Sequence, residues 1–124
     1  GQLLYKGDFH MGKINGRGIY YYQDGCRYEG GFKDGKRHGN GIMYNFDGTK
    51  LIQGHFNEGV VEGKATVNYI DGSRYEGEVK NGLREGYGIL YKRGGFVKKG
   101  IWKNDKFEFR AHSKDFELAG RKAN

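Results

Sequence analysis

Four histidines and two regularly placed glutamates are the residues whose types could support metal or acid–base chemistry. His10, His38, His55 and His112 lie at unrelated distances along the chain. None has a cysteine or a second histidine at a spacing typical of zinc sites. We expect His38, within the KRHG stretch at 36–39, to be a turn residue, because a ligating histidine needs partners to hold a metal. The sequence therefore predicts no metal site and no cofactor.

Glu29 and Glu76 could in principle act as the acid and base of a glycosidase. They occupy equivalent places in a repeated pattern, however, and catalysis needs one special site rather than a copied one. Their spacing suggests ion pairs with a neighbouring unit, through Lys33, Arg37 or Arg84. The Gly-x-Gly pairs of the chain do not open a helix and precede no Gly-Lys-Ser/Thr, so they are not phosphate loops. We expect no enzymatic activity, no catalytic residue and no small-molecule substrate.

The composition indicates a thin, ordered and glycine-punctuated structure. The 124 residues include 24 Gly, 10 Tyr and 8 Phe but 0 Pro, whereas glycine usually makes up about 7% of a chain. A hydrophobic content of 35% is low for a thick core, and disordered chains are poor in aromatic residues. No run is apolar enough to span a bilayer, and nothing resembles a signal peptide. The single Cys26 excludes an internal disulfide and fits a reducing compartment.

Five similar segments follow one another along the chain, at offsets of 23, 24, 23 and 23 residues. They begin YKGDF at Tyr5, YEGGF at Tyr28, IQGHF at Ile52, YEGEV at Tyr75 and KKGIW at Lys98. The third position is always glycine: Gly7, Gly30, Gly54, Gly77 and Gly100. Glycines in such register mark a repeat and not a flexible linker. Because the first segment begins so early, we expect further repeats before Gly1.

Each segment has the pattern of a β-hairpin. Residues 28–33 alternate apolar and polar types, Asp34-Gly35 is typical of a turn with positive φ, and residues 42–46 form a second strand. Asp47-Gly48 then turns the chain back. One hairpin alone is marginally stable in water, so the units must stack on their neighbours. We expect the glycines to let rings of the next unit lie flat on bare backbone.

The pattern Y-E-G-x-(F/W)-x-x-G-x-x-x-G-x-G, followed by an aromatic region and an Asp-Gly turn, resembles the MORN (membrane occupation and recognition nexus) repeat. The resemblance covers residues 5–105, four full units and a fifth half unit. It implies an all-β fold, an elongated single-layer array of antiparallel hairpins. Unit three departs from the pattern at Ile52 and Ala65, which requires a smaller packing partner there. Lys98 and Lys99 replace Tyr-Glu in unit five, which we therefore expect to be a terminal, non-stacking unit.

The last residues lack the glycine register. We divide the chain into a repeat array at residues 1–105 and a C-terminal cap at 106–124. Ser113 could cap a short helix over 114–119 that ends at Gly120. The tail is expected to be a short helical or irregular cap over the last strand. The alternative is a segment that docks onto a partner or another copy.

The positive charge is concentrated at the C-terminal end. Residues 92–124 carry a net charge of +6, out of +7 for the whole chain. One interpretation is a hydrated end of the array; the other is a site for acidic phospholipid. The lipid-binding candidates are Lys92, Arg93, Lys98, Lys99, Lys103 and Lys106. No nucleic-acid-binding motif is present, which disfavours a nucleic-acid partner.

The remaining candidate site is a face of large rings. One stripe is expected to contain Tyr5, Phe9, Tyr20, Tyr28, Phe32, Phe56, Tyr75 and Trp102. The opposite face is also apolar, for example at Ile19, Ile42 and Ile89, and a single-layer sheet cannot hide both faces. We therefore expect a non-enzymatic scaffold that binds a peptide or a second copy through an aromatic-lined groove. The alternative is peripheral binding to phosphoinositide membrane. The resemblance also implies a cytoplasmic setting, at the boundary of membrane and cytoskeleton.

Overall fold

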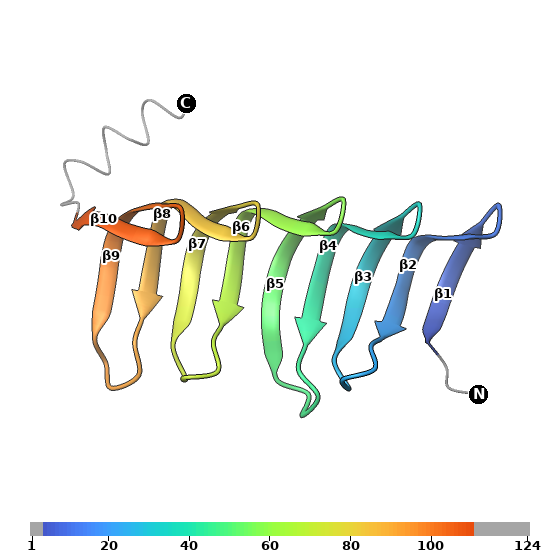
Figure 1. Ribbon diagram of the computed structural model, residues 1–124, viewed down its shortest axis with the longest axis horizontal. Helices are drawn as coiled ribbons and strands as arrows, with labels where there is room; N and C mark the ends of the chain where they lie inside the picture. Colours follow the sequence, from blue (N-terminus) through green and yellow to red (C-terminus); the bar gives the residue numbers. More distant parts are fainter. Residues whose placement is uncertain (1–3, 111–124) are drawn as a thin grey trace.

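The computed structural model describes residues 4–110, which form ten antiparallel strands in one open sheet (Figure 1). The strands are β1 (Tyr5–His10), β2 (Lys13–Tyr21), β3 (Arg27–Lys33), β4 (Lys36–Tyr44), β5 (Lys50–Asn57), β6 (Val60–Asn68), β7 (Arg74–Lys80), β8 (Leu83–Tyr91), β9 (Val97–Lys103) and β10 (Lys106–Arg110). Their order in the sheet is their order in the chain. The predicted all-β, single-layer array of hairpins is confirmed. The helix expected at 114–119 lies outside the described residues.

Two kinds of turn alternate along the array. Tight turns join each odd strand to the next even strand, and both central residues have positive φ, as at Asp34 (50°) and Gly35 (81°). This conformation matches the twist of a two-residue hairpin and confirms the Asp-Gly prediction. In three of the four other turns an aspartate fixes the loop, at Asp24, Asp47 and Asp71. The Asp47 carboxylate accepts hydrogen bonds from the Thr49 amide at 2.9 Å and the Thr49 hydroxyl at 2.6 Å.

A row of glycines crosses the sheet from β1 to β9. Successive strands pair at Gly7, Gly18, Gly30, Gly41, Gly54, Ala65, Gly77, Gly88 and Gly100. The pairing register shifts next to this row, for example between Gly30 and Phe32. Such bulges bend a strand. Figure 1 shows the result, strands that stand side by side with their upper ends bent over.

The aromatic side chains of the core lie on the inside of this bend. Tyr28 and Phe32 are four residues apart, which would separate them by about 13 Å on a straight strand. Their ring centroids are only 5.1 Å apart, in an edge-to-face contact. Rings also connect neighbouring units, since Tyr28 contacts Phe56 at 5.1 Å and Tyr75 contacts Trp102 at 5.6 Å. The bend therefore lets one sheet enclose a core without a second layer.

Hydrogen bonds between units hold the turns in line. The Gly35 amide donates to the carbonyl of Ile14 in the preceding unit at 2.9 Å. The Gly59 amide makes the same bond to Arg37 at 2.8 Å. Neighbouring units are thus joined by a backbone hydrogen bond between their turns, in addition to the contacts between their rings.

The fifth unit stacks like the others, so two predictions about the C-terminal end were wrong. Asp105 donates its amide to the Arg84 carbonyl at 2.9 Å, at the same place as the glycines of earlier units. Trp102 is buried, and its indole N–H donates to the Gly88 carbonyl at 3.1 Å. Residues 106–110, expected to belong to the cap, form β10 and pair with β9. Trp102, at the fifth position, and the turn at Asp105 thus attach this unit although it lacks the first-position Tyr and the Gly-x-Gly pair.

The glycines of the Gly-x-Gly pairs lie within strands, which corrects two further details. β4 begins at Lys36, six residues before the second strand predicted to start at Ile42. Tyr28 lies over Gly41 of its own unit, not over a glycine of another unit. At the fifth position Phe32 pairs in register with Gly16 of the preceding unit, but a side chain on Gly16 would meet Asp8 of its own unit and not the Phe32 ring.

Candidate binding groove

The inner face buries most of the stripe that was expected to line a partner groove. Tyr28 and Tyr75 have no exposed surface. Phe32, Phe56 and Trp102 are also buried in the core. These five rings form a packed floor on the inner face and offer almost no surface to a partner, and of the five only Phe32 also lines a pocket described below. The sequence could not separate core from groove because both need large apolar side chains. Of the eight, Tyr5 and Tyr20 are half-buried and Phe9 is exposed.

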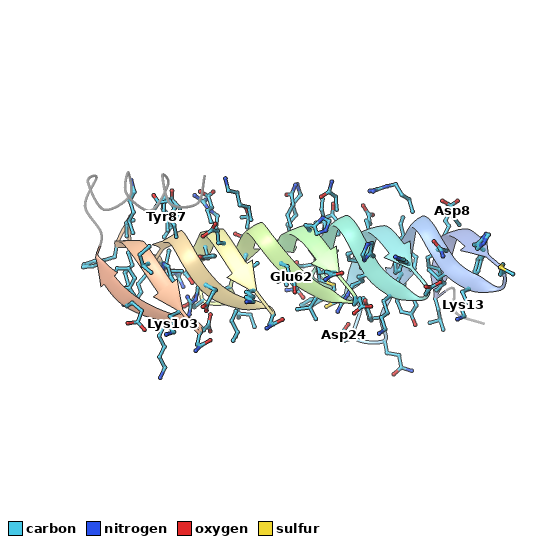
Figure 2. The ribbon with its side chains drawn as sticks, turned by 90° about the horizontal axis from the view of Figure 1, so that it is seen from above. Asp8, Lys13, Asp24, Glu62, Tyr87 and Lys103 are labelled. Atoms are coloured by element: carbon cyan, nitrogen blue, oxygen red, sulfur yellow. The ribbon has the colours of Figure 1, made fainter. Side chains whose placement is uncertain are left out.

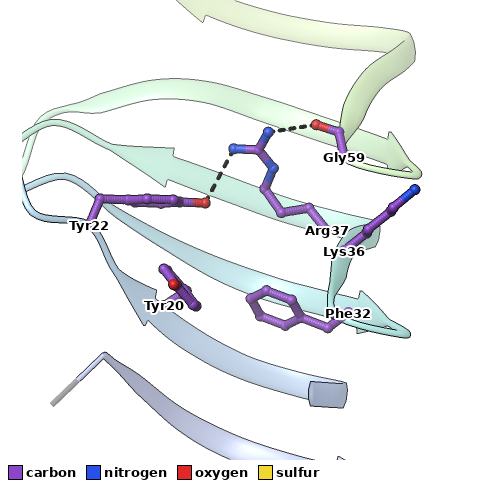
Figure 3. Close-up of a pocket in the computed structure, with 7 residues that line it drawn as sticks. Tyr20, Tyr22, Phe32, Lys36, Arg37 and Gly59 are labelled. Atoms are coloured by element: carbon purple, nitrogen blue, oxygen red, sulfur yellow. Dashed lines mark hydrogen bonds between the residues drawn. The ribbon is translucent and has the colours of Figure 1, made fainter. Parts of the chain in front are cut away.

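One pocket remains open above this floor. It has a volume of about 320 Å³ and is lined by Tyr20, Tyr22, Phe32, Gly35, Lys36, Arg37 and Gly59 (Figure 3). The tyrosines come from β2 and the turn after it, and Arg37 comes from β4. Tyr20 and Tyr22 pack against each other with centroids 4.9 Å apart. No described element covers the pocket on the solvent side, because the array has a single layer.

Arg37 is the charged centre of the pocket. Its guanidinium donates to the Gly59 carbonyl at 2.7 Å and to the Tyr22 hydroxyl at 3.3 Å (Figure 3). Its central carbon lies 5.6 Å from the centre of the Phe56 ring. Sequence reasoning assigned Arg37 only to an ion pair and missed this position. The sequence did contain one indication of this role, because Arg37 and Arg84 occupy the same position in units two and four.

The ion pairs predicted for the repeated glutamates were wrong in their partners. Glu29 pairs with Arg27 at 3.2 Å, and Glu76 pairs with Arg74 at 3.2 Å. Residues two apart on a strand share a face, so each pair forms within one strand on the outer face. Arg37 lines the inner-face pocket and is out of reach.

The outer face is less apolar than the sequence suggested. Ile19, Ile42 and Ile89 are half-buried and lie on even strands. Polar residues face them from the odd strands, with Glu29 paired to both Ile19 and Ile42. Arg27 also covers the Tyr44 ring at 4.0 Å, as Arg74 covers Tyr91 at 4.5 Å. Alternation across strands, which a single strand does not reveal, therefore breaks up this second apolar face. Figure 2 shows side chains projecting from both sides of the ribbon.

The basic candidates for lipid binding do not come together on one surface. Lys98 and Lys99 are adjacent in β9 and so point to opposite faces. Lys92 and Arg93 lie in the turn before β9, whereas Lys103 and Lys106 flank the turn after it, at the other end of the strand. A flat membrane could contact only a part of this set at once.

The histidines give no metal site within the described part of the chain. His38 and His55 have ring centroids 6.3 Å apart, and His38 lies in strand β4 rather than in a turn. The Nδ1 atom of His38 is buried without a hydrogen-bond partner. No group of three or more potential ligands occurs in residues 4–110. The same residues include no helix long and apolar enough to cross a membrane.

These features define a repeat protein, a stack of hairpins with an open pocket on its inner face. The family model for the MORN repeat matches residues 5–27, 28–50 and 75–96, more than half of the chain. The chain therefore belongs to the MORN repeat family, whose repeats are binding modules generally associated with protein and membrane interactions. A search of curated proteins finds no match. The matched ranges omit units three and five, the two that depart from the pattern.

Proposed function

We propose that this chain is a non-enzymatic scaffold module that binds an extended segment of a partner protein along its inner face. The observation that carries the proposal is the open pocket above the packed floor, where Tyr20, Tyr22 and Arg37 converge. Tyrosine and arginine are enriched among the residues that dominate binding energy at protein interfaces. The rings of Tyr20 and Tyr22 are already held in place by their contact with each other. This lowers the conformational entropy that the two side chains lose on binding.

The shape of the site favours a peptide over a small molecule. Sites for small molecules usually enclose most of the ligand surface. Here a single layer of sheet leaves the pocket open along the groove, so a ligand would stay largely exposed unless it extended onto neighbouring units. We also propose the cytoplasmic, cytoskeleton-associated setting that the family resemblance implies. A second copy of the chain is the alternative partner for the pocket.

The proposal is tested by panning a random peptide library against the immobilised chain and measuring affinities of selected peptides by fluorescence anisotropy. We expect Tyr22→Ala to weaken binding by at least about tenfold, the loss expected of a central aromatic contact. Phe46→Ala is the control, because Phe46 is 73% exposed in a turn outside the pocket. Circular dichroism verifies that both variants fold. Peptides that bind both variants equally, or no selected peptides at all, would contradict groove binding. Light scattering across concentrations would reveal self-association instead.

A further inference from the structure

Arg37 and Arg84 occupy the same place in units two and four, nine residues after Tyr28 and Tyr75. Both guanidinium groups lie over the ring at the fifth position of the next unit. The distance is 5.6 Å from Arg37 to Phe56 and 4.6 Å from Arg84 to Trp102. The two sites therefore share one scaffold and can be compared directly.

Arg84 has both a carboxylate and a backbone carbonyl as partners, and both belong to Asp105. Its Nε donates to the Asp105 carboxylate at 2.7 Å, and the backbone amide of Arg84 contacts the same oxygen at 3.2 Å. An Nη2 group donates to the carbonyl oxygen of Asp105 at 2.9 Å. The side chain of Arg84 keeps only 18% of its surface exposed. The site is thus an arginine, partly buried above a ring and neutralised by one carboxylate.

Arg37 has only the backbone half of this arrangement. Gly59 stands where Asp105 stands in unit five, and its carbonyl accepts from Nη2 of Arg37 at 2.7 Å. Glycine supplies no carboxylate. Among the described residues, the Nε of Arg37 has no hydrogen-bond acceptor, and no carboxylate forms an ion pair with this residue. A charge above an apolar floor gains most from an ionic partner, and arginine bonds carboxylates especially well.

We propose that the pocket at Arg37 receives an aspartate or glutamate side chain of the partner segment, in the place that Asp105 fills at Arg84. This inference rests on the proposed function and specifies its partner as an acidic peptide. Lys36 adds a second positive charge to the pocket lining. Tyr20 and Tyr22 would contact the residues that flank the acidic one. Unit five thus contains an internal example of the contact that unit two makes with a partner.

Two substitutions test whether the pocket at Arg37 binds an acidic side chain. Gly59→Asp should place a carboxylate against Arg37 and block the pocket, and the positive φ of 91° at Gly59 is tolerable because Asp105 itself has φ 71°. Arg37→Gln removes the charge. Arg27→Gln is the matched control, since Arg27 lies on the outer face against Tyr44.

We expect selected peptides to share an acidic residue, and its replacement by Asn or Gln to weaken binding at least about tenfold. Arg37→Gln and Gly59→Asp should cause a similar loss, and Arg27→Gln none. Peptides sensitive to Tyr22→Ala but not to Arg37→Gln would overturn this inference and leave groove binding intact. Independently of any peptide, a crystal structure of Gly59→Asp should show the new carboxylate within hydrogen-bond distance of the Arg37 Nε, as the Asp105 carboxylate lies 2.7 Å from the Arg84 Nε. A carboxylate turned away from Arg37 would overturn the inference even if peptides bind.

Discussion

The phenol ring of Tyr28 occupies the space that a side chain on Gly41 would need. A Cβ atom built on Gly41 would collide with the Tyr28 ring, and its hydroxyl donates to the Gly31 carbonyl at 3.0 Å. Tyr75 has the same relationship to Gly88 in unit four. Unit three changes both partners, with Ile52 in place of the ring and the buried Ala65 in place of the glycine. The two departures of unit three, Ile52 and Ala65, therefore compensate each other, because the smaller Ile52 side chain leaves room for the Ala65 methyl group.

We predict that Gly41→Ala destabilises the array by about 1–3 kcal/mol, the usual cost of overpacking. Tyr28→Ile alone should also destabilise it, because the ring leaves a void. The double variant copies the Ile52 and Ala65 pair, so its loss should be clearly smaller than the sum of the single losses. Urea unfolding of all four proteins gives the coupling energy. Simple additivity would show that the two positions are independent.

Alkaline pH should unfold the protein through its buried tyrosines. Burial raises the pKa of Tyr28 to about 12 and also raises the pKa of Tyr75. An unfolded tyrosine ionises near pH 10, so the stabilisation is complete below pH 10 and is lost as pH rises toward 12. Thermal midpoints and tyrosinate absorbance should therefore change together in this window. Tyr28→Phe, which cannot ionise, should flatten the alkaline decline; an unchanged profile would exclude Tyr28 as a cause.

Acid should weaken the aspartate turns. Hydrogen bonds from Thr49 lower the pKa of Asp47, and bonds from Ser73 lower that of Asp71. Their contribution is complete above the unfolded pKa of about 3.9 and is lost as pH falls further. Asp47→Asn keeps an acceptor oxygen but does not titrate. We expect its melting temperature to fall less between pH 5 and pH 2 than that of the unchanged protein, and equal falls would count against the turn as an acid-sensitive element.

Trp102 should be essential to the C-terminal end of the sheet. Trp102→Ala removes a buried indole and should cost about 3–5 kcal/mol. Limited proteolysis should then cut in β9 and β10 before the rest of the array, because repeat units can fray from their ends. Phe96→Ala is the control, since Phe96 is 67% exposed. Protection of both strands in Trp102→Ala would mean that the fifth unit is held by other contacts.

Binding to acidic vesicles should be weak and salt-dependent. Lys98 and Lys99 point to opposite faces, so one membrane cannot engage both. We expect flotation with phosphoinositide vesicles at low ionic strength only, since exposed charges are screened within about 8 Å at physiological salt. Retention at physiological salt that is lost in a variant with Lys92→Glu and Arg93→Glu would instead support the membrane alternative, through the turn before β9.

The sequence by itself determined the repeat, the Asp-Gly turns and the all-β class. These depend on local chemistry: positive φ at Asp34-Gly35, alternation in β3 and the glycine register. It also identified the family, because the same local pattern recurs in several units. Unit boundaries at Tyr28 and Tyr75 could therefore be read directly from the chain.

Only the tertiary structure decided which rings are core and which are accessible. Tyr20 and Tyr28 look alike in sequence, but the bend at the glycine row buries Tyr28 completely and leaves Tyr20 at the pocket. The different fates of Arg37 and Arg84 likewise depend on residues 59 and 105, more than 20 positions away in sequence. Contacts between units are set by bend and register across strands, and a pattern within one strand does not encode them.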